Sequence, residues 1–273
     1  MVKLLEQSVE QLNRSSSKGN QLKWRQNEEW YKADYTGYEG LSEYVVSKLI
    51  SYSSLSANEF VLYDTEIIEY KDNEFLGCKS LNFLKEGSRL ITMEELFKKV
   101  YGHSLNQSIY GIQNVEDRID FVVQKVEEIT GLKHVGEYLT KIMEIDAIFL
   151  NEDRHMNNIA FILDERGDYQ FCPFFDHGAS LLADVTMDYP MKKETEKLIE
   201  TVKSKTFCTS FDEQLDAAEK KYGMQINFLF DRNIVEEILE KELNYPEEYK
   251  KRVCEIINSQ RRKYIYLFAK NKN

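Results

Sequence analysis

The sequence predicts an α+β fold with two lobes, a small β-rich lobe followed by a larger helical lobe. Strand-like runs and polar turns concentrate before residue 84, whereas helical patterns dominate from Met93 onward. A two-stranded hairpin pattern interrupts the helical part between residues 159 and 175. We therefore predict a first lobe over residues 1–84 and a second lobe over residues 85–273.

The first lobe has three predicted parts. A turn and an aromatic strand fit residues 19–32, and EGLSEYVVSKLISY (residues 39–52) places its apolar side chains at helical spacing. Two strand-like runs then lie on either side of the polar turn at residues 71–73. This order predicts a small sheet with one helix inserted into it.

The second lobe contains two strong helix patterns. Asn114 is placed to cap VEDRIDFVVQKVEEIT, and Gly131 is placed to end it. The helix GEYLTKIMEIDAIFL follows directly and leads into NEDRHMNN, after which residues 159–163 and 169–175 form the hairpin pattern around DERGD. The tail predicts two further helices, on either side of Pro246.

Composition excludes several classes of protein. The 273-residue chain has 47 acidic and 36 basic residues, a net charge of −11, which argues against direct nucleic-acid binding. Its N-terminus lacks the apolar region of a signal peptide, and it has no apolar run long enough for a membrane span. Its four cysteines form no C-x-x-C pair. We therefore expect a cytoplasmic protein without a membrane association.

Three polar residues around the hairpin point to phosphoryl-transfer chemistry. Asp153 and Asn158 lie just before it and Asp176 just after it, and we expect Asn158 and Asp176 to meet at its open end. Carboxylate and amide oxygens are ligands that Mg²⁺ accepts beside substrate phosphates. The spacing D-x-x-x-x-N in DRHMNN matches a kinase catalytic loop, and FFDHG falls where a D-F-G motif is expected. In that interpretation Asp153 is the base, while Asn158 and Asp176 bind the metal.

These motifs resemble the kinase core of HipA-type serine/threonine kinases, in which a loop N-D-R-H-x-x-N precedes a hairpin and a metal-binding Asp. Upstream, GNQLK is similar to the nucleotide loop of that family, WYK to its phosphate-binding lysine, SEY to the glutamate on the next helix and GCKSLNFL to the hinge segment. The nucleotide-binding residues that the resemblance implies are Gly19, Gln21, Lys23, Lys32, Glu43, Asn82, Phe83 and His155. The loop around Gly19 departs from a full G-x-G-x-x-G pattern, because it has a single glycine.

The resemblance implies an ATP- and Mg²⁺-dependent kinase that phosphorylates a Ser or Thr hydroxyl of a protein. HipA-type kinases are silenced by autophosphorylation near the nucleotide loop, which makes Ser15, Ser16 and Ser17 candidate phosphosites. The family is also associated with toxin–antitoxin modules, so the resemblance further implies an antitoxin-like protein partner.

The same residues leave other functions open. The D-R-H-x-x-N pattern also permits a small-molecule or lipid phosphotransferase, and a pseudokinase would bind nucleotide without chemistry. Asp153, His155, Asp176 and His177 would suit a metal-dependent hydrolase. Finally, Asp153, Asn158 and Asp176 are residue types that commonly occur in turns and loops for structural reasons alone.

Overall fold

The computed structural model describes residues 1–4 and 21–268, so Gly19 and the candidate phosphosites Ser15, Ser16 and Ser17 lie outside the described residues. The chain divides into two compact units. The first unit comprises Met1–Asn82, Phe175–Val202 and Asn227–Asn273, and the second comprises Phe83–Phe174 and Lys203–Ile226. The lobes that the sequence predicts, 1–84 and 85–273, divide the chain differently and stay a prediction.

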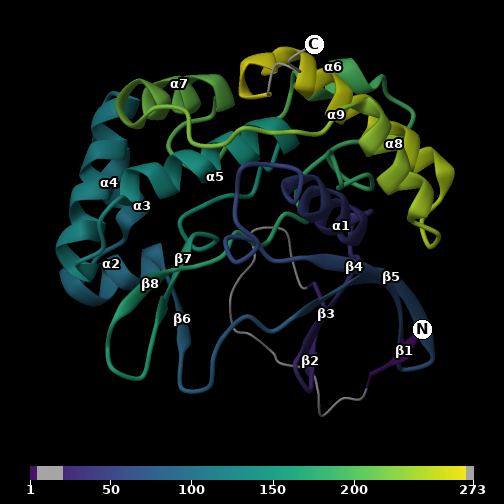
Figure 1. Cartoon of the computed structure of the whole chain (residues 1–273), viewed down its shortest axis with the longest axis horizontal. Helices are drawn as coiled ribbons and strands as arrows, with labels where there is room; N and C mark the ends of the chain where they lie inside the picture. Colours follow the sequence, from purple (N-terminus) through teal and green to yellow (C-terminus); the bar gives the residue numbers. More distant parts are fainter. Residues whose placement is uncertain (5–20, 269–273) are drawn as a thin grey trace. The chain divides into compact units, whose positions relative to one another are not determined.

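A five-stranded sheet forms the N-terminal part of the first unit (Figure 1). Its order is β1 (Val2–Lys3), β4 (Tyr63–Tyr70), β5 (Asn73–Leu81), β3 (Glu29–Ala33) and β2 (Lys23–Gln26). Strand β1 is parallel to β4, and the remaining neighbours are antiparallel. Lys71 and Asp72 connect β4 to β5 with φ of 50° and 59°, as a tight hairpin turn requires. The predicted strand pair around residues 71–73 is confirmed.

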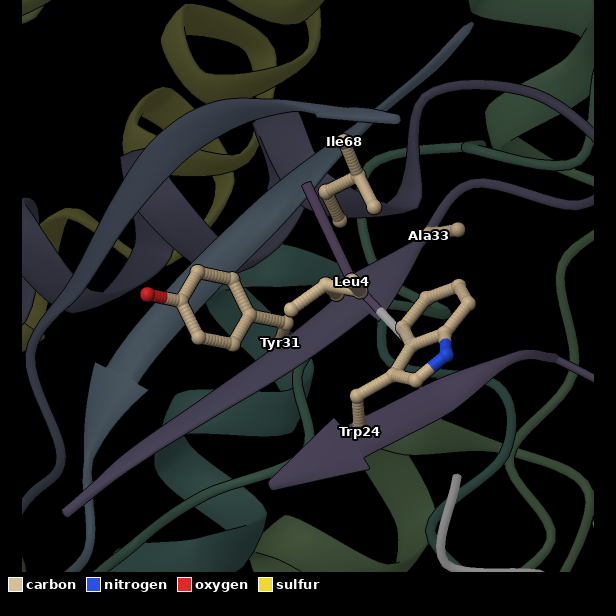
Figure 2. Packing of buried hydrophobic residues seen from close by; sticks show 5 residues of the cluster. All are labelled: Leu4, Trp24, Tyr31, Ala33 and Ile68. Atoms are coloured by element: carbon tan, nitrogen blue, oxygen red, sulfur yellow. The ribbon is translucent and has the colours of Figure 1, made fainter. Parts of the chain in front are cut away.

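An apolar cluster covers one face of the sheet in the first unit. On one face Leu4, Trp24, Tyr31, Ala33 and Ile68 form a buried apolar cluster (Figure 2). Because successive side chains of a strand alternate, Lys32 points to the opposite face from its neighbours. The register places it directly between Lys23 of β2 and Cys78 of β5.

Helix α1 (Glu39–Ile50), which the sequence predicted over residues 39–52, packs against β3, β4 and β5. Two glycines allow close approaches here, Gly40 between α1 and β5 and Gly77 between β5 and β3. A Cβ atom on Gly40 would lie 2.5 Å from the backbone of Gly77, and a Cβ atom on Gly77 would lie 2.1 Å from the carbonyl oxygen of Lys32. The backbone of α1 can therefore lie unusually near β5, the neighbour of the strand that carries Lys32.

The C-terminal part of the first unit is helical. It contains α6 (Thr195–Ile199), α8 (Arg232–Lys241), α9 (Glu247–Lys263) and a short 3₁₀ turn, Ile265–Leu267. Helix α9 packs against both α6 and α8, and α8 also contacts α1. The two predicted tail helices, on either side of Pro246, are confirmed.

The second unit combines a three-stranded antiparallel sheet with five helices among its described residues (Figure 1). The sheet has the order β6 (Arg89–Thr92), β7 (Ala160–Leu163) and β8 (Tyr169–Phe171). The helices are α2 (Met93–Tyr101), α3 (Leu105–Tyr110), α4 (Val115–Thr130), α5 (Val135–Phe149) and α7 (Phe211–Tyr222). The β7–β8 pair confirms the predicted hairpin.

The predicted ends of α4 are also confirmed. The side-chain oxygen of Asn114 accepts a hydrogen bond from the backbone N–H of Asp117 at 2.9 Å, and Gly131 ends the helix with φ of 72°. Helices α4, α5 and α7 pack on one another, and α5 delivers the chain to residues 151–158. Within residues 1–4 and 21–268, no helix combines the length and the apolar character needed to cross a membrane.

Substitution of Gly77 by alanine tests the close approach of β5 to β3. The new methyl group would overlap the backbone of β3, so we expect the free energy of unfolding to fall by about 1–3 kcal/mol. Gly111→Ala is the matched control, because its nearest neighbouring atom would lie 3.9 Å away. Urea unfolding measures both variants, and equal midpoints would contradict the packing described here.

Candidate functional site

A buried lysine and two carboxylates meet in the first unit. The Lys32 Nζ atom lies 2.5 Å from Glu43 Oε1 and 2.9 Å from Asp176 Oδ1. The side chains of Lys32 and Glu43 are only 12% and 2% exposed, whereas that of Asp176 is 24% exposed. We call these three residues the lysine–carboxylate cluster. It joins β3, α1 and the segment that follows the β7–β8 hairpin in sequence.

The electrostatics of the cluster keep Lys32 charged. Burial by itself lowers the pKa of Lys32, but the carboxylates of Asp176 and Glu43 more than offset it, so the pKa lies well above its usual value. The ring of Tyr63 lies 5.2 Å from the ammonium and adds a further favourable contact. The cluster sets two carboxyl groups against one ammonium. Carboxylate oxygens suit a hard divalent cation such as Mg²⁺. Of the two carboxylates, that of Asp176 is more exposed than that of Glu43 and is therefore the more accessible to a metal ion.

Glu43 also binds the backbone beside Asp176. Its second oxygen, Oε2, accepts a hydrogen bond of 2.8 Å from the backbone N–H of His177. One buried carboxylate on α1 therefore binds both Lys32 and the residue next to Asp176. This arrangement determines where the Asp176 side chain lies relative to Lys32.

The backbone around Asp176 is unusual. Asp176 has φ of 63°, and the buried residues Leu181 and Leu182 have φ of 57° and 59°, a region that branched apolar residues rarely adopt. Hydrogen bonds from α1 and its N-cap residue stabilise this conformation. Ser42 Oγ donates to Ser180 O at 3.0 Å, and the Tyr38 hydroxyl donates to Leu181 O at 2.6 Å. Strained backbone of this kind is typical of functional segments that their surroundings hold in place.

The second unit contains Asp153 and Asn158 in the loop after α5. The loop folds back on Asp153, whose carbonyl oxygen accepts hydrogen bonds from Asn158 Nδ2 at 2.8 Å and from the backbone N–H of His155 at 2.9 Å. Because the amide nitrogen of Asn158 is used inside the loop, its side-chain oxygen can serve as a ligand. Asn158 therefore fits the predicted role of an oxygen ligand to Mg²⁺.

Arg154 connects this loop to helix α5. Its guanidinium lies 3.1 Å from Asp146 Oδ2 on α5 and donates to Asn158 O at 3.0 Å, and both ionic side chains are buried. Burial raises the pKa of Asp146 to about 6, although the neighbouring Arg154 opposes the increase. Thr206 Oγ1 also donates to Arg154 O, at 2.7 Å. The loop is thus fixed by a buried ion pair and by a segment 52 residues further along the chain.

His155 lies beside Asp153. Its Nε2 atom is 3.8 Å from Asp153 Oδ2, and its buried Nδ1 has no hydrogen-bond partner among the described residues. The predicted role of His155 in nucleotide binding stays a prediction.

The remaining predicted nucleotide-binding residues lie in both units. Gln21 precedes β2 and is partly exposed, and Lys23 is the cross-strand neighbour of Lys32. Asn82 follows β5, and its side-chain oxygen accepts a hydrogen bond of 3.3 Å from Trp30 Nε1. Phe83 is the first residue of the second unit. The structure thus brings Lys32, Glu43 and Asp176 together in one unit and Asp153, Asn158 and His155 in the other.

Comparisons with known proteins bear on the fold. No family model matches the chain, and no curated protein matches it. Among solved structures, the crystal structure of the Helicobacter pylori proinflammatory kinase CtkA matches with a TM-score of 0.59 over 91% of this chain and 89% of that chain. The chain has a kinase-like fold. At 17% sequence identity the similarity extends to the fold alone, and it confirms the predicted α+β, kinase-like fold class.

Sequence patterns did not identify every residue around Asp153. Lys205 Nζ lies 3.2 Å from Asp153 Oδ1, and Asp146 and Thr206 bind the neighbouring Arg154. Asp146 lies eight residues before Arg154 on the buried side of a helix, and buried acidic residues are a signal for an ion pair. Lys205 has no comparable signal, because no local spacing connects it to residue 153.

Substitution of Arg154 by methionine tests the anchoring of the loop. Since the substitution leaves the Asp146 carboxylate buried without its partner, we expect the free energy of unfolding to fall by about 3–5 kcal/mol. Arg232→Met is the control, because Arg232 pairs with Glu236 while its side chain is 71% exposed. Chemical denaturation compares them, and a loss as small as that of the control would show that the buried pair does not hold the loop.

Proposed function

We propose that the chain is an ATP- and Mg²⁺-dependent phosphotransferase that transfers the γ-phosphoryl group of ATP to a Ser or Thr hydroxyl of a protein. The observation that carries this proposal is the buried Lys32, held at once by Glu43 and Asp176. In a kinase-like fold, a strand lysine paired with a helix glutamate and adjacent to a metal-binding aspartate is the arrangement of an active kinase.

Each residue of the cluster has a part in binding ATP. Lys32 would donate to the α- and β-phosphates, Glu43 would keep its ammonium in position, and Lys23 on the neighbouring strand would add positive charge on the same face. Asp176 and Asn158 would hold Mg²⁺, which supplies charge neutralisation at the β- and γ-phosphate oxygens.

Asp153 would act on the acceptor. Its carboxylate would orient the acceptor hydroxyl and accept its proton while the hydroxyl oxygen forms a bond to the γ-phosphorus. The bond between that phosphorus and the β,γ-bridging oxygen breaks, and ADP leaves with the electron pair. Orientation and charge stabilisation would supply most of the rate acceleration.

The HipA-like type of activity rests on the sequence resemblance in DRHMNN and FFDHG. On that basis we propose a protein acceptor, autophosphorylation at Ser15, Ser16 or Ser17, an antitoxin-like protein partner and a cytoplasmic location. CtkA, a solved protein with a similar fold, is itself described as a kinase.

A transfer assay tests the proposed function. Purified protein is incubated with Mg²⁺ and γ-labelled ATP, alone and with a cell lysate, and label is expected to enter protein. Asp153→Asn should lower the rate by about 10²- to 10⁴-fold because it removes the positioned base. Asp176→Asn should abolish transfer because it removes a metal ligand, and peptide mapping of the labelled chain identifies any phosphosite.

Asp216→Asn is the matched control, since Asp216 lies on the exposed side of α7 and should retain full activity. Nucleotide binding without transfer would favour a pseudokinase, and label confined to small molecules or lipid would favour the other phosphotransferases. A wild-type chain that binds no nucleotide would overturn the proposal.

A further inference from the structure

A second-unit lysine from a distant segment contacts the proposed base. Lys205 Nζ lies 3.2 Å from Asp153 Oδ1, although the two residues are 52 positions apart in the sequence. Lys205 belongs to the segment 203–210 that precedes α7. Its ammonium therefore places a positive charge directly beside the Asp153 carboxylate.

The backbone on both sides of Lys205 is firmly held. Thr206 donates through its hydroxyl to Arg154 O at 2.7 Å, which ties the segment to the loop that carries Asp153. Ser204 Oγ and the backbone N–H of Phe207 both donate to the side-chain oxygen of Gln214, at 3.0 and 3.2 Å. Ser204, Thr206 and Phe207 are buried. Because its neighbours are held in this way, the exposed side chain of Lys205 lies next to Asp153.

The exposure of the pair differs between its members. The side chain of Lys205 is 43% exposed, whereas that of Asp153 is 9% exposed. An ammonium has three N–H donors, and the contact with Asp153 uses one of them. Lys205 has no other partner among the described residues. Because a half-exposed ion pair contributes little stability, folding alone does not account for so fixed a lysine. Its remaining donors can bind an anion that lies next to Asp153.

We propose that Lys205 is a phosphate-binding residue, whose ammonium contacts the γ-phosphoryl group beside Asp153 during transfer. This inference rests on the proposed function. The equatorial oxygens of the phosphoryl group are negatively charged while its bond to ADP breaks and its bond to the acceptor oxygen forms. An ionised Asp153 would repel these oxygens, and an ammonium between them removes that repulsion and stabilises the transition state.

A contact with the γ-phosphoryl group alone has a specific consequence for nucleotide affinity. ATP carries this group and ADP lacks it, so loss of Lys205 should weaken the binding of ATP and leave the binding of ADP unchanged. A residue that merely maintains the shape of the loop would affect the two nucleotides equally.

The test compares Lys205→Met and Lys205→Arg with Lys203→Met, an exposed lysine of the same segment. Calorimetric titrations with Mg²⁺ measure the dissociation constants of ADP and of a non-hydrolysable ATP analogue. For Lys205→Met we expect the analogue to bind about 10- to 100-fold more weakly, as for a lost hydrogen bond to a charged group, and ADP to bind as in wild type. In the transfer assay kcat should fall by roughly 10²-fold. Lys205→Arg, which keeps the charge, should recover part of both losses.

Three results would overturn the inference. Lys205→Met could match Lys203→Met in kcat and in both dissociation constants, or it could weaken ADP and the ATP analogue equally. In both cases a wild-type chain that transfers phosphate would leave the proposed function intact. A wild-type chain that neither binds nucleotide nor transfers phosphate would instead remove the proposed function, and with it the role of Lys205.

Discussion

The ion pairs of Lys32 are the interaction on which the candidate site depends. A buried ammonium is costly unless carboxylates compensate it, and here Glu43 and Asp176 do so at 2.5 and 2.9 Å. The two carboxylates come from α1 and from a segment more than 130 residues later in the chain. The two ion pairs of Lys32 therefore hold β3, α1 and the segment around Asp176 together. They also place the partly exposed carboxylate of Asp176 beside the ammonium.

The packing of the first unit explains why this cluster forms. Gly40 lets α1 lie close to β5, and Glu43 lies one helical turn beyond Gly40. Trp24 and Tyr31 pack in the apolar cluster on one face of the sheet (Figure 2). Lys32 points to the opposite face, where it contacts Glu43 and Asp176. In the second unit, the Arg154–Asp146 pair and Thr206 similarly position Asp153 and Asn158. Each of these two groups of residues, one in each unit, thus depends on buried polar contacts between separate segments of the chain.

Local patterns predicted the elements, and long-range contacts decided the details. The caps of α4 and the turn at residues 71–73 depend on neighbouring residues, and they are found where the sequence predicted them. The pairing of Lys32 with Glu43 agrees with the resemblance, but no pattern in the sequence gives its distance or burial. Lys205 was not predicted, because its contact with Asp153 arises only when a segment 52 residues away folds back. The helices after residue 226 were predicted as helices, yet their place in the first unit depends on tertiary packing.

The most direct test of the account is a crystal structure of the protein with Mn²⁺ and a non-hydrolysable ATP analogue, with Mn²⁺ located by its anomalous scattering. The account predicts Mn²⁺ bound by the side-chain oxygens of Asp176 and Asn158, with Lys32 donating to the α- and β-phosphates. Nucleotide bound elsewhere on the chain, or Mn²⁺ away from both residues, would contradict it.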